Sequence, residues 1–379
     1  MHDAVVAAVH HALVAGSGAA LLALAFALFL LWRKRRAAAA GGAADGAAAA
    51  ATAAPLPVVP LADVERATDG FHPSRVIGQG RHFAVYAAAP DIAAKRMHPH
   101  LVLGDPGGRR FPAAVRSLAV PPHPNLATVV GLSEGPGERV VLVERAPLGA
   151  VGLGRILAGD GGAPALPWRQ RAAVAAGAAR GLAHLHAHGV VHGRVRPCNV
   201  LVNAAGGDGD GGGARWRHAT ARLTDYGLAG FLDRRDDGAR EEDDVYMFGA
   251  VLLELLTGRR WDGGRLADWA LPRIRAGAGV EVLDVARAGS PADKAEARLL
   301  ARAARVALAC VGNDGRSRPG MVEVSAILSD VEAAYRRRDG EPVGEDEEAD
   351  DGEEGRLSGC LLGPSRSVHK ADMLLRPPV

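Results

Sequence analysis

Two glycines and a lysine form the first group of residues whose types and spacing could do chemistry. Gly78 and Gly80 precede a short β-type run that contains Val85, and Ala93 and Lys95 lie in the next such run, after a proline-containing turn. A glycine turn above a strand lets backbone N–H groups approach phosphates, and a lysine on the neighbouring strand supplies a positive charge. Because glycine turns are common, the glycine pair gains its meaning only from the lysine strand beside it.

A cluster of histidines offers a second possible chemistry, metal binding. His184, His186, His188 and His192 crowd one short stretch. On a helix His184 and His188 share a face and His186 does not, whereas a metal site needs convergent ligands, so we expect no metal there. The run GGDGDGGG at residues 206–213 is similar to one calcium-binding repeat, but a single copy predicts a flexible loop.

Strand-like and helix-like stretches surround these groups and must position them. Residues 177–190 predict a helix, and the run VVHGRVRPCNVLV follows it at residues 190–202. Residues 241–260 begin with acidic side chains and continue as a long apolar run, which is typical of a helix whose first turn complements its dipole. Residues 315–328 begin another helix.

Taken together, these stretches resemble the protein kinase domain of plant receptor-like kinases. The matching motifs occur in the family's order, and they are LADVERATDGF, HPNLATVVGL, VLVERAPLG, HGRVRPCNVLV, TDYGLA, DDVYMFGAVLLELLTGR and RSRPGM. Several independent motifs in the correct order are far more specific than any one of them. The resemblance implies an α+β, bilobal fold, with a small β-rich lobe over about residues 72–145 and a larger helical lobe over about residues 146–338.

The resemblance also implies a site for ATP and Mg²⁺. The positions that match the family's nucleotide-binding residues are Gly78, Gly80, Val85, Ala93, Lys95, Glu144 and Leu201. Asn199 and Asp225 match the two metal ligands, and amide and carboxylate oxygens suit Mg²⁺.

Three further residues match positions that hold the family's catalytic core together. His192 and Tyr226 match residues that pack this core, and Asp244 matches an aspartate that holds the catalytic loop through its backbone N–H groups.

The residue that would perform the chemistry is lost. The family's His-Arg-Asp motif reads His192-Gly193-Arg194, so the aspartate that accepts the substrate's proton is replaced by Arg194. An arginine cannot accept a proton at neutral pH, because its pKa exceeds about 12. General-base assistance is worth about 10²–10⁴ in rate. Gly193 replaces the arginine that clasps a phosphorylated activation loop, and Arg196 replaces the catalytic-loop lysine with retention of charge.

The nucleotide-binding parts depart from the family's pattern as well. Ala114 aligns with the glutamate that should pair with Lys95, so we expect Lys95 to be unpaired and less well oriented. Phe83 stands in place of the third glycine and His82 at the loop tip, which hinders close approach of the backbone to phosphates.

The activation segment is short. Asp225 and Asp244 are separated by 19 positions, and the strand-like ledge that holds a peptide substrate has no counterpart. Arg318 matches an arginine whose usual partner belongs to the missing part, so we expect Arg318 to pair elsewhere or face water.

Charge and cysteine content exclude several classes of protein. The 379 residues include 45 Lys and Arg against 43 Asp and Glu, a net charge of +2 that argues against a nucleic-acid partner. The three cysteines, Cys198, Cys310 and Cys360, are too widely spaced for a disulfide framework or a Cys-x-x-Cys zinc site. Free thiols suit a reducing compartment.

An uncharged apolar run at residues 12–32 predicts a transmembrane helix. At 1.5 Å rise per residue it reaches about 30 Å, the thickness of a bilayer's hydrocarbon core. The basic cluster at residues 33–36 follows the run, which favours a retained span over a cleaved signal peptide and places the following residues in the cytoplasm. We expect a single-pass protein, at the plasma membrane, whose residues 1–11 lie outside and are too few to form a folded domain.

The rest of the chain divides by composition. Residues 33–59 predict a basic juxtamembrane segment and an Ala/Gly-rich linker, and residues 60–338 form the kinase-like domain. Residues 339–379 predict an acidic, disordered tail.

Three hypotheses for function follow from these observations. The joint loss of the base, the loop clasp and the peptide ledge favours a membrane-anchored pseudokinase that serves as a scaffold or allosteric partner of active kinases. The expected partner is a protein such as an active receptor kinase at the same membrane. A serine/threonine kinase with residual phosphotransfer and a binding module gated by ATP stay open as alternatives.

Overall fold

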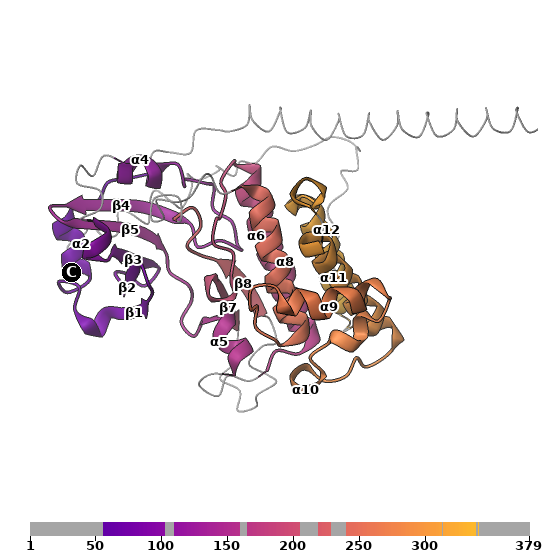
Figure 1. The fold of residues 1–379 in the computed structure, drawn as a ribbon. Helices are drawn as coiled ribbons and strands as arrows, with labels where there is room; N and C mark the ends of the chain where they lie inside the picture. Colours follow the sequence, from indigo (N-terminus) through magenta and orange to yellow (C-terminus); the bar gives the residue numbers. More distant parts are fainter. Residues whose placement is uncertain are drawn as a thin grey trace, which may run out of the picture. The chain divides into compact units, whose positions relative to one another are not determined.

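The computed structural model describes residues 56–102, 110–159, 165–204, 219–228, 240–312, 314–338 and 340. The predicted transmembrane run, its basic flank and all of the acidic tail except Gly340 lie outside these residues. Within the described ranges no helix is both long and apolar enough to cross a bilayer. The described chain forms two lobes, one built on a sheet and one mainly helical, as the sequence predicts (Figure 1).

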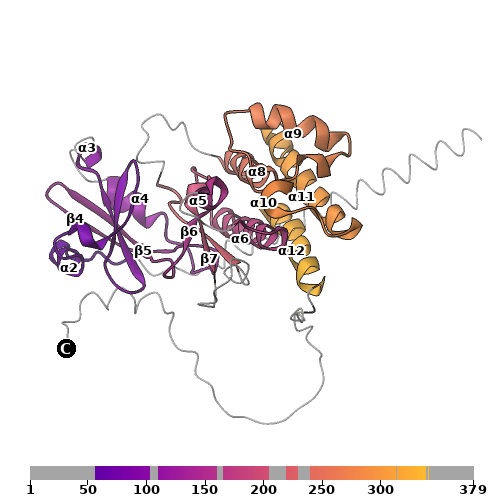
Figure 2. The ribbon, with the colours of Figure 1, turned by 90° about the horizontal axis from the view of Figure 1, so that it is seen from below.

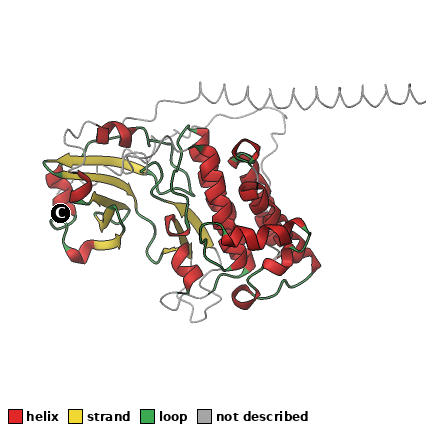
Figure 3. Ribbon diagram, in the orientation of Figure 1, coloured by secondary structure: helices red, strands yellow, loops and turns green. Residues whose placement is uncertain are grey.

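The first lobe is built on a five-stranded antiparallel sheet with strand order β1-β2-β3-β5-β4 (Figure 3). Its strands are β1 (Val76–Gln79), β2 (Phe83–Ala87), β3 (Ile92–Met97), β4 (Val129–Gly135) and β5 (Glu138–Glu144). Alternate residues of β3 and β5 point to opposite faces. Because each face packs against its own apolar cluster, both strands are almost entirely buried.

Helix α2 (Leu61–Ala67) and the residues before it cover one face of this sheet. Val64 of α2 is fully buried, and the backbone N–H of Val59 donates to the carbonyl of Leu132 in β4 at 2.8 Å. The packed body therefore includes residues 57–59, which the sequence predicts as linker.

Two short helices follow β3 in the first lobe, α3 (Pro99–Val102) and α4 (Arg110–Arg116). Phe111 and Val115 of α4 pack beneath the second face of the sheet, in the same apolar cluster as Ala93 and Val141. This face is the one that continues into the core of the second lobe.

The second lobe is a bundle of helices with a three-stranded sheet, β6-β7-β8, at its side (Figure 2). The strands are β6 (Val151–Gly152), β7 (Val200–Ala204) and β8 (Ala219–Leu223). The helices are α5 (Leu153–Ala158), α6 (Trp168–Ala187), α8 (Glu241–Thr257), α9 (Arg265–Arg275), α10 (Val285–Ala288), α11 (Lys294–Gly312) and α12 (Met321–Arg338). Helix α6 packs against α12 and β8, and α8 packs against α11.

Helix α8 shows how the sequence sets its boundaries. Acidic side chains from Glu241 to Asp244 fill its first turn, where they complement the positive end of the helix dipole. Gly258 ends the helix at φ 66°, a left-handed conformation that glycine adopts without a Cβ clash.

The segment before β4 joins the two lobes. The Ala127 N–H donates to the Leu223 carbonyl and the Leu223 N–H donates to the Asn125 carbonyl, both at 2.8 Å. Helix α6 allows this approach because Gly181 has no side chain, and a Cβ there would lie 2.7 Å from the Asn125 carbonyl oxygen. The ring of His123, in the same segment, stacks on His184 of α6 with centroids 4.7 Å apart.

Because of this histidine pair, we expect the folded domain to become less stable in acid. Burial, and then the charges of His184 and Arg180, lower the pKa of His123 to about 4. The unfolded histidine has a pKa of about 6.5, so unfolding takes up a proton between the two values and stability decreases as the pH falls through that range. Burial lowers the pKa of His184 and of His192 too, and both act in the same direction.

We therefore expect the unfolding midpoint of the full-length protein to drop between about pH 6.5 and pH 4. The variant His123→Gln should show a shallower drop, because one proton uptake is removed. His100→Gln, at an exposed histidine of α3, is the matched control. Equal slopes for His123→Gln and wild type would contradict this assignment.

Candidate functional site

A cavity of about 490 Å³ lies between the sheet of the first lobe and the β7–β8 region of the second. All the residues that the sequence singles out for nucleotide, metal or catalytic roles line it, namely Gly78, Gly80, Val85, Ala93, Lys95, Glu144, Arg194, Arg196, Asn199, Leu201 and Asp225. The structure thus brings together positions that are up to 147 residues apart in the chain, Gly78 and Asp225.

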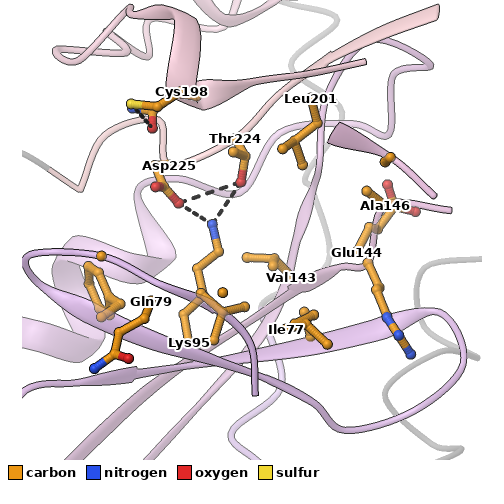
Figure 4. Close-up of a pocket in the computed structure, with 18 of the residues that line it drawn as sticks. Ile77, Gln79, Lys95, Val143, Glu144, Ala146, Cys198, Leu201, Thr224 and Asp225 are labelled. Carbon is orange, nitrogen blue, oxygen red and sulfur yellow. Dashed lines mark hydrogen bonds and ion pairs between the residues drawn. The ribbon is translucent and has the colours of Figure 1, made fainter. Parts of the chain in front are cut away.

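One end of the cavity is apolar. Val85 of β2, Ala93 of β3 and Val143 of β5 form one wall, and Leu201 of β7 faces them from the second lobe (Figure 4). Glu144 lies at the edge, where its backbone N–H donates to the Thr128 carbonyl at 2.8 Å. A slot with apolar walls and backbone polar groups at its edge can hold a planar aromatic base.

The opposite end is centred on Lys95, which is only 4% exposed. Its ammonium group donates to the Thr224 hydroxyl at 2.7 Å and to the carboxylate of Asp225 (Figure 4). Helix α4, which holds Ala114, contains no acidic residue. The expectation that Lys95 would be unpaired is nevertheless wrong, because the ammonium group turns to the carboxylate on the facing lobe instead.

Asp225 is held in an unusual backbone conformation, with φ at 65°. Aspartate is among the few residues that tolerate this left-handed region. Burial alone would raise the pKa of its carboxyl group, but the charge and hydrogen bond of Lys95, helped by His192 and Arg194, outweigh burial and lower that pKa. Asp225 is therefore ionised at neutral pH and already neutralised by a cation of the chain.

The loop that contains Arg194 is held by Asp244 of α8. The backbone N–H groups of His192 and Gly193 donate to the two carboxylate oxygens of Asp244 at 2.6 and 2.8 Å. His186 of α6 contacts the same carboxylate, at 3.0 Å. The predicted role of Asp244 is confirmed, and His186 helps to hold this carboxylate in place.

Arg194 crosses the cavity to the glycine-rich turn. Its guanidinium group donates to Nδ1 of His82 at 2.7 Å. Because a guanidinium has donors only, this nitrogen must be the acceptor. The Gly80 N–H donates to the Phe83 carbonyl at 2.9 Å and closes the turn, while the Phe83 side chain is buried in the core. The sequence singles out Arg194 and His82 separately, but it does not predict the contact between them.

The predictions for Tyr226 and Arg318 can also be compared with the described residues. The Tyr226 hydroxyl is buried and accepts the N–H of Val129 at 3.0 Å. Arg318 does pair elsewhere, since it donates to the Glu242 carbonyl at 2.8 Å and lies over the ring of Tyr246. The predicted absence of a peptide-binding ledge concerns the segment between Asp225 and Asp244. Residues 229–239 of that segment lie outside the described part of the chain.

The residues at this end do not fit a resident Mg²⁺ ion, which prefers several uncommitted oxygen ligands. Of the two predicted ligands, Asp225 is paired with Lys95. Asn199 donates its amide N–H to the Arg194 carbonyl at 2.9 Å, and its one side-chain oxygen, Oδ1, accepts from the Cys198 thiol at 3.5 Å. Across the described residues, no group of three or more His, Cys, Asp or Glu is placed to hold a metal. The carboxylates among the lining residues are those of Glu144, at the apolar end, and Asp225.

The geometry can be compared with that of known proteins. The family model of protein tyrosine and serine/threonine kinases matches residues 77–243. The chain is 34% identical over 320 residues to the leucine-rich repeat receptor protein kinase MSL1 of Oryza sativa subsp. japonica, with 73% of this chain and 21% of that protein covered. It spans about a quarter or less of the length of two leucine-rich repeat receptor kinases to which it is similar, namely MSL1 and, from Arabidopsis thaliana, EMS1.

A shorter relative is covered over most of its length. Salt tolerance receptor-like cytoplasmic kinase 1 of Oryza sativa subsp. japonica is 30% identical over 309 residues, which cover 72% of this chain and 80% of that protein. Among solved structures, the pseudokinase domain of BIR2, described as an immune regulator of the RLK/Pelle family, is similar with a TM-score of 0.54 and 26% identity. The match covers 76% of this chain and 91% of that one.

The Asp244 contacts generate a stability prediction. Asp244→Ala leaves two backbone N–H groups and His186 without their acceptor in a site that is 1% exposed. We expect a loss of about 3 kcal/mol or more in the free energy of unfolding, at about 1–3 kcal/mol for each of the three buried unsatisfied groups. Chemical denaturation measures it, and Asp268→Ala, at an exposed position of α9, is the control. Similar losses in both variants would refute the anchoring role.

Proposed function

Because the chain belongs to the family of receptor-like protein kinases, we propose that it is a pseudokinase, which signals through binding and not through phosphotransfer. The observation that carries this proposal is the side chain at the base position. Arg194 is a permanent cation, and it donates to His82 inside the cavity where a proton acceptor is required.

No other described side chain is placed to replace the missing base. Asp225 is paired with Lys95, and Glu144 lies at the apolar end of the cavity. A base must come within hydrogen-bond reach of the substrate hydroxyl, and general-base assistance is worth about 10²–10⁴ in rate. The similarity to the pseudokinase domain of BIR2 supports the same conclusion.

The nucleotide end of the cavity supports a role for ATP in binding. Apolar walls at Val85, Ala93 and Leu201 and the buried Lys95 are all retained. An ATP-gated module, in which nucleotide shifts a conformational equilibrium, is therefore compatible with the loss of catalysis. In this form of the proposal ATP is a ligand and not a phosphate donor.

The proposed place of action is the plasma membrane. The apolar run at residues 12–32 and the basic cluster after it support a single span with the kinase-like domain in the cytoplasm. An anchored domain without catalysis is suited to act on an active receptor kinase in the same membrane, as a scaffold or allosteric partner. Reconstitution in vesicles with such a kinase should change the rate at which that kinase phosphorylates its substrate.

Catalysis is tested directly with the purified full-length chain, Mg-ATP labelled at the γ-phosphate, and casein. We expect no transfer to casein or to the chain itself above that of the Lys95→Ala variant, because both lack a usable catalytic site. Transfer by wild type clearly above that control would overturn the pseudokinase proposal and favour residual kinase activity.

A second experiment asks whether the base is the only defect. Arg194→Asp restores the carboxylate, yet we expect it to leave peptide phosphorylation at the level of the Lys95→Ala control. The reason is the predicted absence of the peptide ledge between Asp225 and Asp244. Recovery of activity by this single change would mean that the short activation segment still holds a substrate.

A further inference from the structure

We infer that the cavity binds ATP without a divalent cation, with Lys95, Arg194 and Arg196 holding the phosphates. The inference rests on the proposed function, in which the nucleotide cleft is kept and phosphotransfer is lost. Its basis is the charge of the cavity's polar end, which the change at position 194 makes positive.

Charge is the first step. In the family pattern that the sequence resembles, the polar end carries two lysines or arginines and two aspartates. Here Lys95, Arg194 and Arg196 face a single ionised carboxylate, that of Asp225, and Arg81 also lines the cavity. A polyanionic triphosphate is attracted to such a site, and an added dication is repelled by it.

The chemistry of arginine is the second step. A guanidinium group presents several N–H donors in a rigid plane that matches phosphate oxygens, and it is never deprotonated in proteins. Arg194 can therefore supply the neutralisation that Mg²⁺ supplies elsewhere in the family. Its present partner, His82, is a neutral acceptor, so exchange of this bond for one to a phosphate replaces a contact between an ion and a neutral group with one between opposite charges.

The metal-binding side of the site is the third step. Asp225 Oδ1 accepts from Lys95, and Oδ1 of Asn199, the one oxygen of that side chain, accepts from the Cys198 thiol at 3.5 Å. A Mg²⁺ ion would have to displace the ammonium group and settle beside Arg194. In the turn, the Gly80 N–H is committed to the Phe83 carbonyl and is one donor fewer for a phosphate. This loss increases the share of the phosphate contacts that the side-chain cations would supply.

The test is an equilibrium titration of the full-length chain, kept in detergent, with a fluorescent ATP analogue and competition by unlabelled ATP. We expect the dissociation constant for ATP in EDTA to lie within about threefold of that in excess Mg²⁺. AMP should bind at least tenfold more weakly than ATP in EDTA, because it lacks the phosphates that the cations hold.

Variants separate charge from loop geometry. Arg194→Gln should weaken binding in EDTA at least tenfold, whereas Arg194→Lys should keep most of it. His82→Ala removes the bridge but leaves the cation, so its affinity should equal or exceed that of wild type. Arg305→Gln, at an exposed position of α11, changes the net charge equally and should have no effect. Unfolding midpoints of all variants report whether the fold is kept.

Several results would overturn the inference. One such result is the disappearance of ATP binding in EDTA, and another is equal affinity for ATP and AMP. A third is a loss of ATP affinity in His82→Ala as large as that in Arg194→Gln. Failure of ATP to bind in either buffer would also overturn it. None of these outcomes touches the proposal of lost catalysis, which the phosphotransfer assay decides separately.

Discussion

The buried carboxylate of Asp244 is the contact on which the site depends. It accepts the backbone N–H groups of His192 and Gly193 and contacts His186, so the shape of the loop is fixed through its main chain. Because these bonds do not involve the side chain at position 194, the loop presents that side chain to the cavity whatever its identity. A fold held in this way can lose its catalytic base and keep its architecture.

The changed side chain then reorganises the electrostatics around it. With a cation at position 194 and no acidic residue on α4, Asp225 is the one carboxylate near Lys95 among the residues that line the polar end. The ion pair that results joins β3 of the first lobe to Asp225, the second residue after β8 of the second lobe. It occupies both groups that an active site would use for phosphate and metal. The ion pair therefore adds a contact between the lobes to the hydrogen bonds made by the segment before β4.

Much of the fold and of the site could be predicted from the sequence, because the signals lie in short stretches of adjacent residues. The β-rich and helical lobes, the family, and the role of Asp244 follow from motifs in which a few adjacent residues carry the signal. The pairing of Lys95 was missed because it depends on a contact between residues 130 positions apart. The sequence does contain a signal for this pair, because it predicts Asp225 and Lys95 in the same site and offers Lys95 no acidic partner on α4. The Arg194–His82 bridge had no such signal, because the conformation of the glycine-rich turn decides it.

Under the proposed function, the bridge offers a physical route by which a domain without catalysis could still signal. Arg194 has one guanidinium group, which can be bonded to His82 or to a phosphate in the cavity. A ligand that takes this group releases the turn between β1 and β2 from the catalytic loop, and a ligand that leaves it keeps the two lobes bridged. Such a ligand has different contacts in the two states, which is the requirement for shifting an equilibrium between them. The substitution that removes the proton acceptor therefore creates a connection between cavity occupancy and the relation of the lobes, a property that a partner protein could read.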